Sequence, residues 1–405
     1  MGYRDIYKES NEQAEERFSL VMERIAEIAE ETDVPEKFDD YFKKTAAFLL
    51  QLKNVSEKAE KDTLKDASLT ECEKQNAGFY DDIKAENYGK SYGNPTYAVE
   101  KLGEEYGQIL SALYAECRKR ITDAYAAKKM NVTITAELFV EIYNYFEDKE
   151  GIDKTAIEQA IYWYFHDYSE IFIGDSVREL VDSEEDFLYQ IVMNSDLNDL
   201  RYLYQYGQHI GKNETGIAAF LNGMSDEEIQ AMADTYTEGY RIGFAATGKD
   251  LSKKTTAQVR YPIGFERMVR AAVKNLEKLN LKVTMRACSS AANKQYDYDH
   301  KEDKALYYDK AYVERRLEVM KTSFEEMKKL ANGQAGPAVI EVFGEIPFSP
   351  ETKKEVLKLD EKQQQLSVYD MSMSGQITNQ YIIGEERSFT IIAYPVPEIG
   401  EKFEE

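Results

Sequence analysis

The sequence predicts a mainly α-helical N-terminal region followed by an α/β, Rossmann-like domain with a parallel sheet. Up to about residue 250, apolar residues recur at the three- and four-residue spacing of helices. Beyond Gly248, short strand-like apolar runs alternate with helical segments. Such alternation implies right-handed crossovers and a parallel sheet covered on both faces. We therefore expect a helical extension over 1–250, an α/β domain over 251–397 and an acidic tail over 398–405.

Capping residues mark the helices of the first region. Asn94-Pro95 combines a capping side chain with proline at the first helical position, and the apolar spacing that follows predicts one continuous helix to about Ile121. Ser225 and Glu228 form a capping box that opens another helix. The stretch 54–94 has few large apolar residues, so we expect a looser connector there.

In the second region, strands are expected over 256–261, 281–287, 337–343 and 388–394, with helices after each of the first three. The segment between the second strand and its helix, 296–303, reads as an acidic, tyrosine-rich loop. The last strand is an apolar run closed by Pro395 and Pro397, which predicts a buried strand. Only an acidic tail follows it, and we expect such a strand to lead into a further element.

Composition excludes several classes of function. The chain has 51 Lys and Arg against 75 Asp and Glu, a formal charge of −24, and its basic residues lie among acids. Such a charge repels nucleic acid and anionic lipid, so we expect neither partner. No apolar run could span a bilayer, and residues 1–6 lack the apolar core of a signal peptide. Three widely spaced cysteines fit a reducing compartment, so a cytoplasmic protein is expected.

Motifs for common chemistries are missing. The turn after the first strand has one glycine, Gly264, where a dinucleotide fingerprint needs three. Neither a P-loop nor a Gly-x-Ser-x-Gly nucleophile motif occurs. We therefore assign no catalytic residue and no cofactor to this chain.

Two groups of polar residues are candidates for binding at the carboxyl edge of the sheet, where open parallel sheets place their ligands. Four could hold a metal ion or could simply form a solvated acidic loop: Asp297, Asp299, His300 and Glu302. Arg260 and Arg267 could orient a carboxylate, or could pair with nearby acids.

Part of the second region resembles a known family. The segment 260–283, with Arg260-Tyr261-Pro262 at its start, is similar to the opening strand–helix–strand unit of the two-metal aminopeptidases (aminopeptidase T, aminopeptidase S and PepS). The run Arg387-Ser388-Phe389-Thr390-Ile391-Ile392-Ala393-Tyr394-Pro395-Val396-Pro397 resembles that family's R-W-T-apolar-apolar-x-Y-P-T-P segment, with Phe for Trp and Val for Thr. Residues 1–250 look like the helical extension of its longer, clostridial-type members.

The resemblance implies a leucyl-type aminopeptidase that removes N-terminal residues from peptides and forms a homodimer. It implies two divalent ions, Zn, Co or Mg, held by a domain that follows the Y-P-x-P segment. Tyr394, Pro395 and Pro397, with the two arginines, would then lie at a cleft or hinge.

Since the chain ends soon after that segment, we expect it to be inactive alone. The alternatives are a non-enzymatic interaction protein with a relic α/β domain, favoured by 30 tyrosines, and an enzyme centred on His300.

Overall fold

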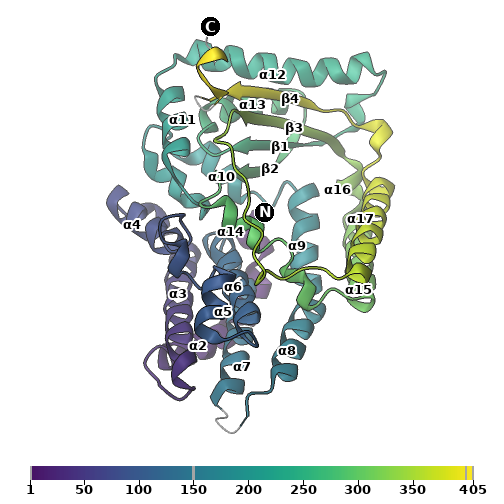
Figure 1. Ribbon diagram of the computed structural model, residues 1–405. Coiled ribbons are helices and arrows are strands. Elements are labelled where there is room, and N and C mark those ends of the chain that lie inside the picture. The colour runs from purple at the N-terminus through teal and green to yellow at the C-terminus, as the bar shows by residue number, and fades with distance from the viewer. Residues whose placement is uncertain (1, 148–150, 397–398, 404–405) are drawn as a thin grey trace.

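The computed structural model describes residues 2–147, 151–396 and 399–403. It is mostly helical, with one small, four-stranded, all-parallel sheet, which confirms a helical region followed by an α/β region (Figure 1). Among the residues described, no helix is long and apolar enough to cross a membrane.

Twelve α-helices precede the first strand in the described part of the chain. They are α1 (Tyr3–Ile6), α2 (Lys8–Ile28), α3 (Glu36–Glu60), α4 (Leu69–Tyr80), α5 (Pro95–Leu102), α6 (Gly107–Tyr125), α7 (Lys129–Glu147), α8 (Lys154–Asp167), α9 (Ser169–Val181), α10 (Phe187–Asn194), α11 (Lys212–Asn222) and α12 (Asp226–Ala246). The segment expected to be a loose connector, 54–94, contains the end of α3, all of α4 and two short 3-10 helices, so a little under half of it is α-helix.

The caps form where they were predicted. The Asn94 side chain accepts from Thr96 N, and Ser225 and Glu228 make a reciprocal capping box. The helix expected to run on from Asn94 is, however, two helices. Gly103 ends α5 with φ +89°, a conformation that favours glycine. At the start of α6, a Cβ on Gly107 would lie 2.5 Å from Val99 Cα, so this close crossing requires glycine.

Aromatic side chains fill the core of helices α2–α8. Phe38 and Phe146 meet edge to face with ring centroids 4.6 Å apart, and Phe42 lies 5.1 Å from both Phe146 and Tyr143. All four are fully buried. Each such pair adds about 0.5–1.5 kcal/mol beyond the burial of its area, so this cluster holds the bundle together.

The sheet has the strand order β2-β1-β3-β4, and all neighbours are parallel. Its strands are β1 (Thr256–Pro262), β2 (Lys282–Cys288), β3 (Gln334–Phe343) and β4 (Thr390–Pro395). The α-helices among them are α13 (Glu266–Lys278), α14 (Lys294–Asp299), α15 (Lys310–Glu326), α16 (Lys328–Asn332) and α17 (Glu361–Tyr381). All four strands lie where the sequence predicted them, within a few residues.

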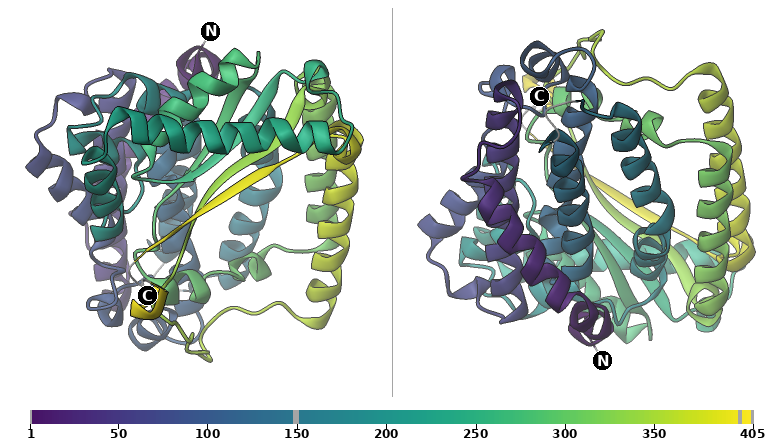
Figure 2. Two further views of the ribbon diagram at one scale, coloured as in Figure 1. Left: turned by 90° about the horizontal axis from the view of Figure 1, so that it is seen from above. Right: turned by 90° about the horizontal axis from the view of Figure 1, so that it is seen from below.

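Helices cover one face of the sheet, fully over β1 and partly over the edge strand β4. Figure 2, in its view from above, shows α12 lying across the strands. Ala257, Val259 and Tyr261 of β1 are buried on this face. Tyr394 of β4 also points to it, with its hydroxyl 3.1 Å from Met268 Sδ of α13.

The opposite face is covered only at the amino-terminal ends of its strands, so the prediction of cover on both faces was wrong. There the Leu180 carbonyl, at the end of α9, accepts hydrogen bonds from Thr284 and Gln334. α15 packs against α9 and α17 in a separate core and leaves the rest of this face uncovered. We call the uncovered part the open half-face; its exposed residues are Arg260, Arg286, Glu341, Ile391 and Ala393, with Val339 partly exposed among them.

β4 is an edge strand, not the buried strand that its apolar run predicted. Its residues alternate between the helix-covered face, with Ile392 and Tyr394, and the open half-face, where Ile391 is 54% exposed. An edge position explains the difference, since β3 is its one neighbour in the sheet.

The hydrophobic cores do not follow the predicted boundary at residue 250. α10, α11 and α12 share one core with the sheet and α13, whereas residues from α2 to α8 form another. α10–α12 precede the first strand in the chain. Their apolar spacing predicted that they are helices, but it did not show which core they join.

Candidate functional site

The stretch predicted as an acidic loop around His300 forms the short helix α14 and a turn. His300 is held by two acceptors: Nδ1 lies 2.7 Å from Asp303 Oδ2, and Nε2 donates to the Gly93 carbonyl at 2.6 Å. The ring also contacts Tyr296, with centroids 4.8 Å apart. With both nitrogens engaged, His300 acts as a tie between α14 and the turn before α5.

The other three metal candidates are equally dispersed. Asp299 is fully buried and accepts from Tyr88, Gln295 and Lys353 at 2.6–2.7 Å. Asp297 is solvent-exposed. Glu302 lies beside Lys304, with 3.9 Å between Oε2 and Nζ. The four candidates therefore do not converge on one metal position.

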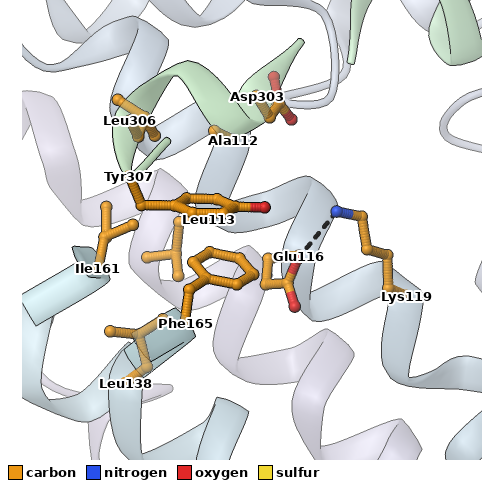
Figure 3. A pocket seen from close by; sticks show the side chains of 10 residues that line it. All are labelled: Ala112, Leu113, Glu116, Lys119, Leu138, Ile161, Phe165, Asp303, Leu306 and Tyr307. Atoms are coloured by element: carbon orange, nitrogen blue, oxygen red, sulfur yellow. Dashed lines mark hydrogen bonds and ion pairs between the residues drawn. The ribbon is translucent and has the colours of Figure 1, made fainter. Parts of the chain in front are cut away.

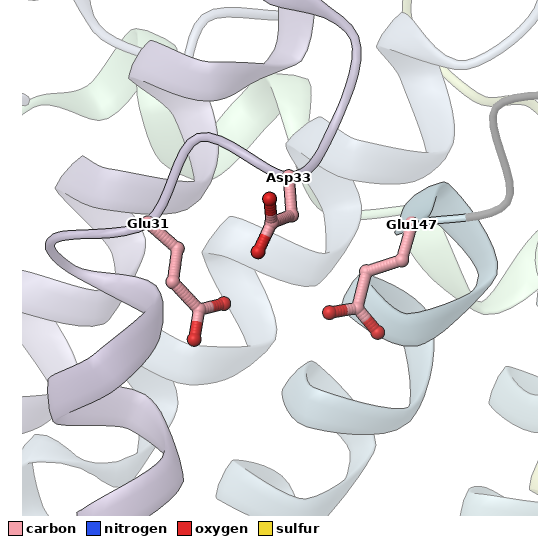
Figure 4. Close-up of side chains that lie close together, drawn as sticks. All are labelled: Glu31, Asp33 and Glu147. Atoms are coloured by element: carbon pink, nitrogen blue, oxygen red, sulfur yellow. The ribbon is translucent and has the colours of Figure 1, made fainter.

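A different group of acids does converge in the described part of the chain. The oxygens of Glu31, Asp33 and Glu147 lie within 4.8 Å of one another (Figure 4). Arg24 binds Glu31 and also donates to Glu147 at 2.9 Å. The hydrogen bond from Arg24 is the largest cause that lowers the pKa of Glu31. Arg24 thus bridges two of the three acids and ties the segment after α2 to the end of α7.

The helical region also encloses a small cavity between α6, α8 and the turn after α14 (Figure 3). Its volume is about 20 Å³, which admits about one water molecule. Phe165 and Tyr307 stack at 3.7 Å in its wall, and Glu116 pairs with Lys119 at 2.9 Å. This space is too small for a substrate.

The two arginine candidates have different environments. Arg267 donates to Asp226 Oδ1 at 2.6 Å and to the Met224 carbonyl at 2.9 Å, so it ties α13 to the start of α12. Arg260 instead projects from β1 onto the open half-face, where its Nε donates to Gln258 Oε1 at 2.6 Å. Of the two, only Arg260 is free to meet a ligand.

Arg286 of β2 lies directly beside Arg260. The two are partners in the parallel register, so their side chains project from the same face of the sheet. A third arginine, Arg387, precedes β4 and lies beside Gly336 of β3. Partial burial, and then the charges of Arg286 and Arg387, lower the pKa of Arg260. Sequence analysis missed Arg286 because adjacency across strands depends on register.

The remaining cleft and hinge candidates are placed as follows. Tyr394 packs on Phe265, with centroids 5.1 Å apart, beneath the helix-covered face and away from the open half-face. Pro395 is exposed at the end of β4, opposite Phe343 in the register. Pro397 lies outside the described residues.

A buried carboxyl at the carboxyl end of β1 was also missed. Glu266, the first residue of α13, is fully buried, and its Oε2 accepts from Tyr202 and from Gly264 N at 2.8 and 2.9 Å. Burial raises the pKa of Glu266 to about 7. The signal in the sequence was slight: one acid between Phe265 and an apolar helix.

Comparisons with protein-family models, with curated proteins and with solved structures return no match for this chain.

Proposed function

We propose that this chain is the peptide-binding, N-terminal portion of a leucyl-type metallo-aminopeptidase and has no hydrolytic activity alone. One observation carries the proposal. The segment that most resembles the aminopeptidases, 387–397, forms β4 in its described part, in parallel register with β3, and borders an uncovered, basic and apolar half-face. An extended peptide fits such a surface, since it can lie along exposed strands.

The strand order supports a Rossmann-like class. Order β2-β1-β3-β4 reproduces the first four positions of a doubly wound sheet whose strand order reverses between β1 and β3. Ligands of such sheets bind near the carboxyl ends of the strands at that reversal. Arg260 of β1 and Val339 of β3 are register partners there. The open half-face therefore lies in the region where this class binds its ligands.

The donors of this chain do not fit a two-metal centre. Among the described residues, two of the three converging acids, Glu31 and Glu147, are already bound by Arg24, and the candidates around His300 are dispersed. We accordingly assign the two divalent ions, Zn, Co or Mg, to the domain that the family resemblance places after residue 397. In this proposal the present chain orients the peptide.

The test is an assay of the purified chain with leucyl-nitroanilide in the presence of cobalt or zinc, beside calorimetric titration with short leucyl peptides. We expect peptide binding without turnover. Metal-dependent turnover that co-purifies with the chain would refute the assignment of catalysis to another domain. Absence of peptide binding would refute the peptide-binding role.

The alternative, a non-enzymatic interaction protein, loses its compositional support. More than half of the 30 tyrosines are buried within the protein, and these are not available to form an interface with a partner. Light scattering of the chain with and without candidate proteins tests this alternative, and also the homodimer that we propose for the full-length form. We further place the protein in the cytoplasm, in keeping with its free cysteines Cys72, Cys117 and Cys288.

A further inference from the structure

Two like charges stand side by side on the open half-face. Arg260 and Arg286 are directly paired in the register of β1 and β2, so their Cα atoms are about 4.8 Å apart and both side chains project from one face. Like charges directly opposite each other destabilise a sheet. Both side chains are exposed. The two adjacent positive charges therefore lower the stability of the sheet unless a negatively charged group neutralises them.

Glu341 of β3 is an exposed acid on the same half-face, but it forms no ion pair with either arginine. Within residues 2–147, 151–396 and 399–403, no carboxylate oxygen lies within 4.0 Å of the guanidinium of Arg260 or of Arg286. Many other arginines pair with acids, such as Arg118 with Asp82 at 2.8 Å and Arg316 with Asp370 at 2.6 Å, whereas Arg270 donates to backbone carbonyls. What distinguishes Arg260 and Arg286 is that two exposed arginines without a carboxylate partner among the described residues stand side by side in a chain of formal charge −24.

Arg387 adds to the same positive region. Its charge is a smaller cause, after burial and Arg286, of the lowered pKa of Arg260. The region thus joins side chains from β1, β2 and the approach to β4. Guanidinium groups bind carboxylates through two parallel hydrogen bonds, which a neutral group cannot replace.

An apolar surface continues from the arginines across the sheet. Val339 of β3 is the register partner of Arg260, and Ile391 of β4 is the register partner of Val339. Ala393 is exposed two residues further along β4. A ligand that fits both parts carries an anionic group at one end and small or branched apolar groups beside it.

We propose that Arg260 and Arg286, supported by Arg387, bind the C-terminal carboxylate of a short apolar peptide that lies across β3 and β4. The identification of the ligand as a peptide rests on the proposed function; the oxyanion site rests on the three arginines alone. Bound there, the peptide neutralises the paired guanidinium groups and covers Val339 and Ile391.

The decisive comparison is between a peptide acid and its amide. Calorimetry at low ionic strength would measure the binding of Ala-Leu-Leu with a free carboxylate and of Ala-Leu-Leu amide. We expect the acid to bind at least about tenfold more tightly, which is the effect of about 1.4 kcal/mol. Arg260→Gln and Arg286→Gln should each remove that preference. Arg286→Lys should restore part of it, because a lysine keeps the charge but not the paired hydrogen bonds.

Arg241→Gln is the matched control. Arg241 lies on α12, over the covered face, and pairs with Glu238, so its loss changes the net charge equally without touching the half-face. It should keep the full preference for the acid. An equal loss in Arg241→Gln would show a general charge effect and overturn the proposal. Melting curves followed by circular dichroism would establish that all variants are folded.

The outcomes separate this inference from the proposed function. If the acid and the amide bind equally, peptide binding stands and the carboxylate site is wrong. If neither binds, the proposed function is wrong and the ligand is not a peptide, and the phosphate test below decides whether the oxyanion site stands. Inorganic phosphate provides a second test, independent of peptides. We expect it to raise the melting temperature of the parent chain and of Arg241→Gln but not of Arg286→Gln, and an equal rise in all three would overturn the oxyanion site.

Discussion

Replacing Glu266 with glutamine should make the protein less sensitive to pH, because its carboxyl is buried where ionisation is costly. Burial raises the pKa of Glu266 from 4.5 to about 7. The folded state therefore holds a proton that the unfolded state releases between these values, and stability falls as pH rises from about 4.5 to 7. At 1.36 kcal/mol per pKa unit, the loss between pH 5 and pH 8 is about 2.5 kcal/mol.

The assay is urea unfolding of the parent chain and of Glu266→Gln at pH 5 and pH 8. Glutamine can still accept from Tyr202 and Gly264 N. We therefore expect the free energy of unfolding of the variant, minus that of the parent, to be about 2 kcal/mol larger at pH 8 than at pH 5. Glu16→Gln, at an exposed position, controls for the loss of one charge. Burial also raises the pKa of Glu185 to about 7, but that group contributes equally to both chains and cancels. An identical pH dependence in parent and variant would refute the reasoning.

Three further substitutions test the packing. Asp299→Ala leaves the largely buried Lys353 ammonium without its carboxylate and should cost about 3 kcal/mol in urea unfolding; a loss below about 1 kcal/mol would mean that the pair is not structural. Gly336→Ala places a Cβ 2.0 Å from the Ser388 carbonyl at φ +109°, so it should cost at least about 2 kcal/mol and abolish hydrogen-exchange protection in β4, whereas retained protection would contradict it. Phe42→Ala should cost about 3–5 kcal/mol by thermal melting, and a near-neutral effect would show that the aromatic cluster is not the bundle core.

Much of the fold followed from local pattern. The strands were predictable because each is a short apolar run bounded by turn residues or prolines, and the caps at Asn94 and Ser225 because they depend on neighbouring residues alone. The break at Gly103 was missed because apolar spacing continued through it. Only tertiary packing decides that a crossing occurs there.

The candidate site was less predictable for the same reason. Arg260 was identified from its place at a strand end, but Arg286 became its neighbour through register, which depends on how whole strands align. His300 and Asp299 suggested a metal by composition, and the partners that occupy them, Gly93 and Lys353, lie far away in sequence. Sequence spacing could not show that those donors were already engaged.

The separate core formed by α9, α15 and α17 has a consequence for the dynamics of the sheet edge. Cooperative units of local unfolding often coincide with such self-contained packing clusters. α17 leads directly into β4 through the turn Gly384–Glu386, where Glu386 pairs with Lys254 at 2.9 Å. Local unfolding of this cluster would disrupt the hydrogen bonds between β4 and β3 while β1, β2 and β3 stay paired. Amide protons of β4 should therefore exchange together with those of α17, on a faster timescale than the three strands they adjoin.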